Sequence, residues 1–269
     1  MRRLHSPPRL RPVLMTVADA CERDERVLAG WLGGSLARGV ADDWSDIDLH
    51  VIVNDEAAFT AAVLDWFGQL MPLVLADEIP GVPGGFIFLT PGWVHVDFVV
   101  HGADTFEPDG HPVKVLFDRA GLVHDVEPAG DDPHGGPYLP DTPSTTFLYF
   151  MGNLVTVARR GEWFALAQGT ATMRDSLLIP LMLAQNGVRK SDGAKRLNRY
   201  LTDEQQAALR SIPAIGSDPE DLFAAQRAIA HEYLRRGRRL AAQVGAEWPD
   251  ALESAVRELW ARELGMAIE

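Results

Sequence analysis

Residues 33–53 read GGSLARGVADDWSDIDLHVIV and carry two aspartates, Asp46 and Asp48, at the start of a run of strand-forming residues. Side chains alternate between the two faces of a β-strand, so residues two apart point the same way. Neighbouring carboxylates repel each other, and a divalent cation removes that repulsion. Paired carboxylate oxygens are typical of a magnesium site. The pattern therefore predicts a strand over residues 46–53 with a metal site at both aspartates, and a surface turn before a strand is the alternative.

A glycine turn precedes the two aspartates. Gly33, Gly34 and Ser35 follow a short apolar run. Glycine lets the backbone approach a ligand closely, and the free N–H groups of a helical turn attract phosphate oxygens. The turn therefore predicts a phosphate contact at Gly34 and Ser35, and an ordinary strand-to-helix turn is the alternative.

A third aspartate lies inside the apolar run WVHVDFVV, residues 93–100. The alternation predicts that the apolar residues of this run occupy one face of a strand and that His95 and Asp97 project from the other. An acid inside an apolar strand needs a partner. For Asp97 this partner would be a metal ion or a proton taken from a substrate.

Taken in order, Gly34-Ser35, Asp46-x-Asp48 and Asp97 resemble the pattern of the nucleotidyltransferase superfamily, which includes DNA polymerase β and the antibiotic-modifying nucleotidyltransferases. In that superfamily the Gly-Ser turn holds a triphosphate and the paired aspartates bind two Mg²⁺ ions. The third carboxylate completes the metal site or acts as the base. The resemblance implies these roles for the five residues of this chain.

The resemblance covers roughly residues 27–100 and implies a transfer reaction. A substrate hydroxyl attacks the α-phosphorus of a nucleoside triphosphate, with ATP as the expected donor, and pyrophosphate leaves in line. Asp97 would take the hydroxyl proton. Arg38, one helical turn after Ser35, would help to orient phosphate, and an exposed helix arginine is the alternative.

The chain divides into two parts with different periodicity. Residues 1–140 contain short apolar runs bounded by glycine and proline, which predicts an α+β catalytic domain with a mixed sheet and flanking helices. Residues 127–144 are rich in Pro, Gly and Asp and mark the boundary. Residues 141–269 have a period near 3.6, which predicts a substrate-binding bundle of about five helices. The expected strands cover residues 26–35, 46–53, 73–79, 85–90, 93–100 and 111–118, and the expected helices cover residues 12–26, 55–71, 145–162, 162–187, 202–212, 217–236 and 248–264.

The helical half also resembles, more loosely, the C-terminal domain of aminoglycoside and lincosamide nucleotidyltransferases. This resemblance implies a small, cationic acceptor that carries a hydroxyl group, such as an aminoglycoside. Glu78, with Asp77 beside it, is the predicted substrate contact, and Lys195, with Arg196, is the predicted triphosphate contact. Surface acids at a strand end and a solvated helix face are the respective alternatives.

Composition limits the class of partner and the compartment. The chain has 38 acidic and 25 basic residues and a net charge of -13. This balance disfavours nucleic acid and favours a cationic small molecule. Cys21 is the only cysteine, so the chain needs no oxidising compartment. The sequence contains no run of 18 consecutive apolar residues, so no membrane span is predicted. We therefore expect a cytoplasmic protein, and no oligomeric state is predicted.

Two other functions remain open at this point. The first is transfer to a protein side chain, as in the nucleotidyltransferases of toxin and antitoxin pairs. The second is a regulatory protein that keeps the fold without catalysis. The retention of all three carboxylates disfavours the second.

Other features predict structural roles. The scattered histidines show no zinc-binding spacing and are expected at the surface or in satisfied core positions. The run RRGRR at residues 235–239 predicts a solvated helix face. The tryptophans of the helical half are expected to pack in the core or between the domains. The histidines are His95, His101, His111, His124 and His134, and the tryptophans are Trp163, Trp248 and Trp260.

Overall fold

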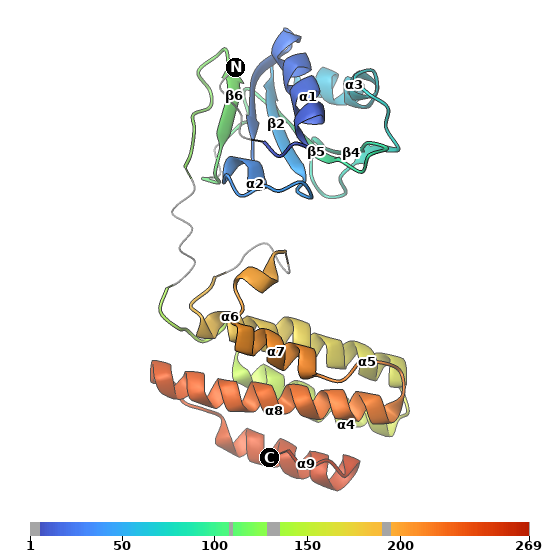
Figure 1. Cartoon of the computed structure of the whole chain (residues 1–269), viewed down its shortest axis with the longest axis vertical. Helices are drawn as coiled ribbons and strands as arrows, with labels where there is room; N and C mark the ends of the chain where they lie inside the picture. The colour runs from blue at the N-terminus through green and yellow to red at the C-terminus, as the bar shows by residue number, and fades with distance from the viewer. Residues whose placement is uncertain (1–5, 108–109, 128–134, 190–194, 269) are drawn as a thin grey trace. The chain divides into compact units, whose positions relative to one another are not determined.

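The chain forms two compact units, Met1–Asp131 and Asp132–Glu269. The first holds a β-sheet with helices and the second is helical (Figure 1), which confirms the predicted fold class. The predicted domain division after residue 140 stays a prediction. The computed structural model describes residues 6–107, 110–127, 135–189 and 195–268.

Six strands build the sheet of the first unit. Their order across the sheet is β3-β4-β5-β2-β1-β6. The central strands β2 and β5 are parallel, and the other neighbours are antiparallel, so the sheet is mixed as predicted. All six predicted strands are present. They are β1 (Val27–Leu32), β2 (Ile47–Val53), β3 (Leu75–Glu78), β4 (Gly85–Leu89), β5 (His95–Gly102) and β6 (Lys114–Asp118).

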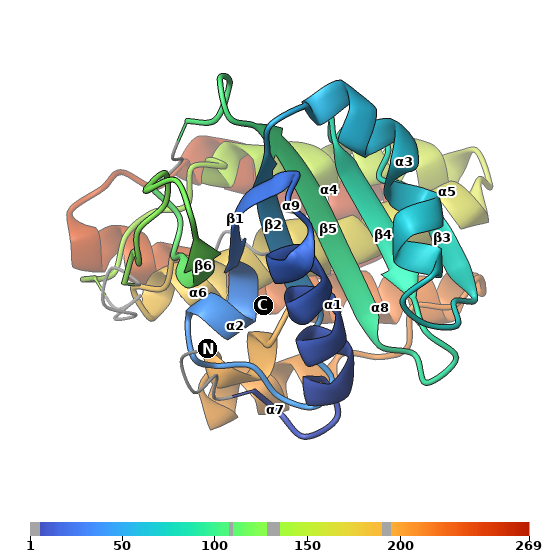
Figure 2. The ribbon, with the colours of Figure 1, turned by 90° about the horizontal axis from the view of Figure 1, so that it is seen from above.

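Helices α1 (Arg11–Arg23) and α3 (Glu56–Gly68) cover one face of the sheet (Figure 2). The apolar core between them and the strands buries alternate residues of β2 and β5, because side chains alternate along a strand. Asp55 accepts a hydrogen bond from the backbone N–H of Ala58 and so caps α3. Cys21 belongs to this core, and burial raises the pKa of its thiol far above the ordinary range. It is a packing residue.

The opposite face of the sheet is only partly covered. Trp31 and Ile52 form a small apolar cluster there with Phe106 and Val113, which follow β5 in the sequence. The polar positions of β2 and β5 lie on this same face, away from α1 and α3. The open face therefore presents the predicted carboxylates.

The second unit is built from helices, and its predicted helix over residues 162–187 is interrupted. A π-helical segment, Met173–Leu178, separates α5 from α6 and ends just before Pro180. Proline lacks an N–H, so the helix is interrupted here by this widened turn. None of the helices in the described residues has the length and apolar character that a membrane crossing requires. The α-helices are α4 (Ser144–Arg159), α5 (Trp163–Thr172), α6 (Ile179–Gln185), α7 (Asp203–Ser211), α8 (Pro219–Val244) and α9 (Asp250–Leu264).

Three helix ends in the second unit follow from local capping chemistry. Thr202 and Gln205 form a reciprocal capping box at the start of α7. Asp218 caps α8, and Pro219 is its first residue. Gly187, with φ +72, follows the end of α6. These ends depend on local chemistry that the sequence displays directly.

The basic run on α8 is not wholly solvated, and the prediction is wrong for Arg236. This side chain is buried and donates hydrogen bonds to Glu232 at 2.8 Å and to Glu204 at 2.5 Å. Acids on α7 and α8 supply the partners that a buried guanidinium needs. Trp260 is fully buried, and its indole N–H donates to the carbonyl oxygen of Met151, which confirms its packing role.

Candidate functional site

Asp48 and Asp97, two of the predicted site residues, lie side by side on neighbouring strands. The parallel register of β2 and β5 pairs Asp48 directly with Asp97. Residues paired across a sheet share a face, and this is the open one. Asp46 lies one residue before β2, so the predicted strand start was wrong by one residue. The reason is a turn closed by Asp42, whose carboxylate accepts hydrogen bonds from the residues just before Asp46.

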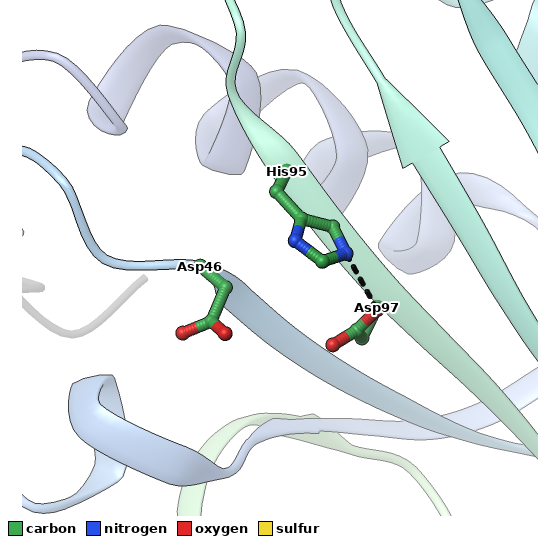
Figure 3. A group of neighbouring side chains, drawn as sticks. All are labelled: Asp46, His95 and Asp97. Atoms are coloured by element: carbon green, nitrogen blue, oxygen red, sulfur yellow. Dashed lines mark hydrogen bonds and ion pairs between the residues drawn. The ribbon is translucent and has the colours of Figure 1, made fainter. Parts of the chain in front are cut away.

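Asp46, His95 and Asp97 converge on one space (Figure 3). One ligand atom of each lies within 4.8 Å of the other two. His95 Nε2 lies 2.8 Å from Asp97 Oδ1. Two carboxylates and an imidazole form a donor set that suits a divalent cation, so these residues fit the metal that the predicted chemistry requires. His95 was expected in a structural role, and this position makes it a candidate site residue.

The carboxylate of Asp48 lies against the glycine turn. Gly34 has φ +51, and a Cβ added there would stand only 1.8 Å from Asp48 Oδ2. A side chain at residue 34 is therefore excluded both by the backbone conformation and by the carboxylate. Ser35 follows at the start of the short helix α2 (Gly34–Ala37), and its buried Oγ has no hydrogen-bond partner among the described residues.

The family model of the nucleotidyltransferase domain matches residues 14–75, the stretch that contains the glycine turn, Asp46 and Asp48. The first unit contains a nucleotidyltransferase domain. Asp97 lies beyond the matched residues, and the register of β5 against β2 is what brings it beside Asp48.

Two solved structures are similar to the chain at low identity. One is an aminoglycoside 6-adenyltransferase from Bacillus subtilis, with 13% identity and a TM-score of 0.37 over 94% of this chain and 97% of that one. Another is a STING-associated CdnE c-di-GMP synthase from Capnocytophaga granulosa, with 14% identity and a TM-score of 0.30 over 87% of this chain and 81% of that one. A search of curated proteins gives no match.

A cavity of about 310 Å³ opens beside the glycine turn of the nucleotidyltransferase domain. Gly33, Gly34, Arg38 and Asp48 form part of its lining. Arg38 caps the C-terminal end of α2 and is half-buried. Gly34 and Arg38, two of the residues predicted to contact phosphate, thus border one cavity.

Aromatic rings form another wall of this cavity. Trp31, His50 and His101 stack with ring centroids 5.2 to 5.4 Å apart, and His50 Nδ1 lies 3.1 Å from His101 Nε2. Sequence reasoning did not single out Trp31 or His50. The signal for His50 was its place two residues after Asp48, on the same strand face. His111 and His124 also line the cavity, and His134 lies outside the described residues.

Glu78 does not share the face of the carboxylates. Across β4, the register aligns Glu78 with Phe98, which is buried on the helix side, and aligns Asp77 with Asp97. Both acids are exposed on the edge strand β3. The structure therefore brings Asp77, and not the predicted Glu78, onto the face of Asp97.

Lys195 and Arg196 belong to the second unit, just before the 3-10 turn Leu197–Arg199. Arg196 has φ +55, which is uncommon for a residue other than glycine. The triphosphate contact of Lys195 stays a prediction.

Proposed function

We propose that the protein transfers a nucleoside monophosphate, AMP from ATP in the expected case, to a hydroxyl group of a small cationic molecule such as an aminoglycoside. Two Mg²⁺ ions are the expected cofactors. The observation that carries the proposal is the direct pairing of Asp48 with Asp97 beside Gly34, in a unit that contains a nucleotidyltransferase domain.

The glycine turn supports the nucleotide side of the reaction. Ser35 Oγ is buried without a partner among the described residues, and a phosphate oxygen would accept a hydrogen bond from it. Gly34 leaves room for close approach, and the positive charge of Arg38 borders the adjoining cavity. A triphosphate bound here would reach the carboxylate of Asp48.

The carboxylates support the transfer step. Asp97 accepts the proton of the attacking hydroxyl, whose oxygen forms a bond to the α-phosphorus. The bond between the α-phosphorus and its bridging oxygen breaks, and pyrophosphate leaves with that oxygen. Asp46, Asp48 and Asp97 would hold the cations, which supply charge compensation for the attacking and leaving oxygens when bound.

Charge supports a cationic acceptor. The net charge of -13 raises the local concentration of cations around the protein. Asp77 adds a carboxylate on the open face, two strands from Asp97 and therefore roughly 10 Å away. An acceptor with several amines could contact Asp77 while its hydroxyl lies at Asp97.

Mass spectrometry of reaction products tests the proposal. The purified chain is incubated with Mg²⁺, each common nucleoside triphosphate, and a panel of aminoglycosides and neutral polyols. A mass gain of one nucleoside monophosphate on a cationic acceptor is expected. A gain on protein would instead favour the transfer to a protein target, and no gain on any acceptor would refute the proposal.

A further inference from the structure

We propose that the cavity beside the glycine turn holds the nucleoside of the donor, with its base stacked on the aromatic wall formed by Trp31, His50 and His101. A base held by its ring faces favours purines over pyrimidines, because a purine has the larger ring system. The inference rests on the proposed function for the identity of the donor. It adds a position for the base, which the glycine turn and the carboxylates do not provide.

The aromatic wall has the geometry that stacking requires. The ring centroids of His50 and His101 lie 5.4 Å apart and their nearest nitrogens only 3.1 Å apart, so the two imidazoles lie edge to edge. Their planes differ by 13°, and the plane of Trp31 lies within 20° of both. Three rings from neighbouring strands therefore share one orientation, in which a planar base can stack on them.

The aromatic wall adjoins the place expected for the phosphates. A Cβ added at Gly33 would lie 3.2 Å from Nε2 of His50, and one added at Gly34 would lie 1.8 Å from Oδ2 of Asp48. The two glycines thus lie over two positions of β2 that face the same way and are about 7 Å apart along the strand. Phosphorus and base are separated by a similar distance in a nucleotide. A donor with its α-phosphorus at Asp48 therefore brings its base to His50.

The cavity has the size and surface of a small-molecule site. Its volume of about 310 Å³ lies at the lower end of the range for such sites, and most of its remaining lining is apolar. Trp31 is only 5% exposed and packs against Phe106, with ring centroids 5.1 Å apart. The indole is thus held in place before a ligand binds, which lowers the entropic cost of binding. The apolar lining residues include Val113, Leu122, Val123 and Val126.

The position proposed for the acceptor lies on the other side of the carboxylates. Asp77 is on β3, beyond β5 and β4, whereas Trp31 is on β1, on the opposite side of β2. A base on the aromatic wall and an acceptor near Asp77 would therefore not compete for the same space.

The first test compares ligands that differ only in the base. Calorimetry measures the binding of ATP, GTP, CTP, UTP and ribose 5-triphosphate to the full chain, with Mg²⁺ and without an acceptor. ATP and GTP should bind about 5- to 140-fold more tightly than ribose 5-triphosphate, the range expected for one base stacked on aromatic side chains. CTP and UTP should have intermediate affinities.

A matched pair of substitutions locates the base. Trp31→Leu and Trp66→Leu each remove one indole from an aromatic cluster of the first unit, but Trp66 packs in the core on the helix side of the sheet. Trp31→Leu should lower the affinity for ATP by at least about 5-fold and leave the affinity for ribose 5-triphosphate unchanged. Trp66→Leu should change neither affinity. In the original protein, nuclear Overhauser contacts should join the adenine protons of bound ATP to ring protons of the aromatic wall.

Four results would overturn the inference. They are no binding of ATP, equal binding of ATP and ribose 5-triphosphate, equal loss of ATP affinity in the two variants, and no contact between adenine and the aromatic wall. The ligand comparison and the Overhauser contacts need no substitution, so they decide the question even if Trp31→Leu does not fold. Because no acceptor is present, a failure of nucleotidyl transfer would refute the proposed function and leave this result standing.

Discussion

Asp48 and Asp97 lie directly opposite each other on the parallel strands β2 and β5, on the sheet face away from α1 and α3. Neighbouring strands are about 4.8 Å apart, so two negative charges are held side by side. The carboxylate of Asp48 also occupies the space that a side chain at Gly34 would need. This relationship joins the glycine turn to the carboxylates and is the basis of the predictions below.

Asp48→Asn should reduce nucleotidyl transfer by at least about 100-fold, because the transfer depends on charge at this position. The side chain is only half-buried, so the melting temperature should remain close to that of the original protein. Asp65→Asn, an exposed position on α3, is the control and should keep full activity. A fully active Asp48→Asn variant would remove Asp48 from the site.

Gly34→Ala should abolish transfer, because the new methyl group would displace the Asp48 carboxylate from 1.8 Å away. The control variant Gly39→Ala distinguishes the effect of this clash from the effect of backbone strain. Gly39 also has a positive φ, +69, but a Cβ there meets no described atom within 4 Å. We expect Gly39→Ala to lose only about 1 kcal/mol of stability and to keep activity. Steady-state kinetics and urea unfolding of both variants measure the difference, and equal activity in the two would contradict the clash.

Asp77→Asn should raise the KM for a cationic acceptor several-fold and leave kcat nearly unchanged, because Asp77 shares the face of Asp97 without touching it. Glu78→Gln removes the same charge from the adjacent residue on the opposite face. It should change the KM much less. Equal effects of the two substitutions would indicate a general charge effect instead of a contact.

Glu253→Gln should destabilise the helical unit in a pH-dependent way. Burial alone would raise the pKa of Glu253, but hydrogen bonds from Arg238, Trp248 and Arg257 lower it below the ordinary value. A lowered pKa in the folded state gives stability that is present above the unfolded pKa of about 4.3 and is lost as the pH falls through the folded pKa.

At neutral pH, the substitution should lower the free energy of unfolding by about 2 to 3 kcal/mol. This value is toward the low end for a broken buried ion pair, because the arginines are partly exposed. Urea unfolding at neutral and acidic pH measures it, and the gap between variant and original should narrow in acid. Glu258→Gln, at an exposed position of the same helix, is the control. A gap that stays constant with pH would show that the carboxylate charge is not the cause.

The strands and the three aspartates could be predicted from the sequence because their signals are local. Alternation of apolar and polar residues places Asp97 on the face opposite Val96 and Phe98, and β5 follows that pattern. The glycine turn was equally visible, since few other residues allow the conformation of Gly34.

The remaining features depend on contacts between distant segments. His95 joins Asp46 only because β5 packs in one register against β2, and no spacing of histidines reveals that. The choice between Asp77 and Glu78 depends on the register of β3, whose four residues are all exposed and carry no apolar alternation. The burial of Arg236 depends on Glu204, which lies on a different helix.

The most direct test of the central claim follows the phosphorus atoms of ATP. The chain is incubated with Mg²⁺ and a cationic acceptor, using ATP labelled with ³²P at either the α or the γ position. The account predicts that the α label becomes attached to the acceptor and that the γ label is released in pyrophosphate, with neither event in Asp48→Asn. Two results would contradict nucleotidyl transfer at this site. One is transfer of the γ label to the acceptor, and the other is consumption of ATP while the acceptor stays unlabelled.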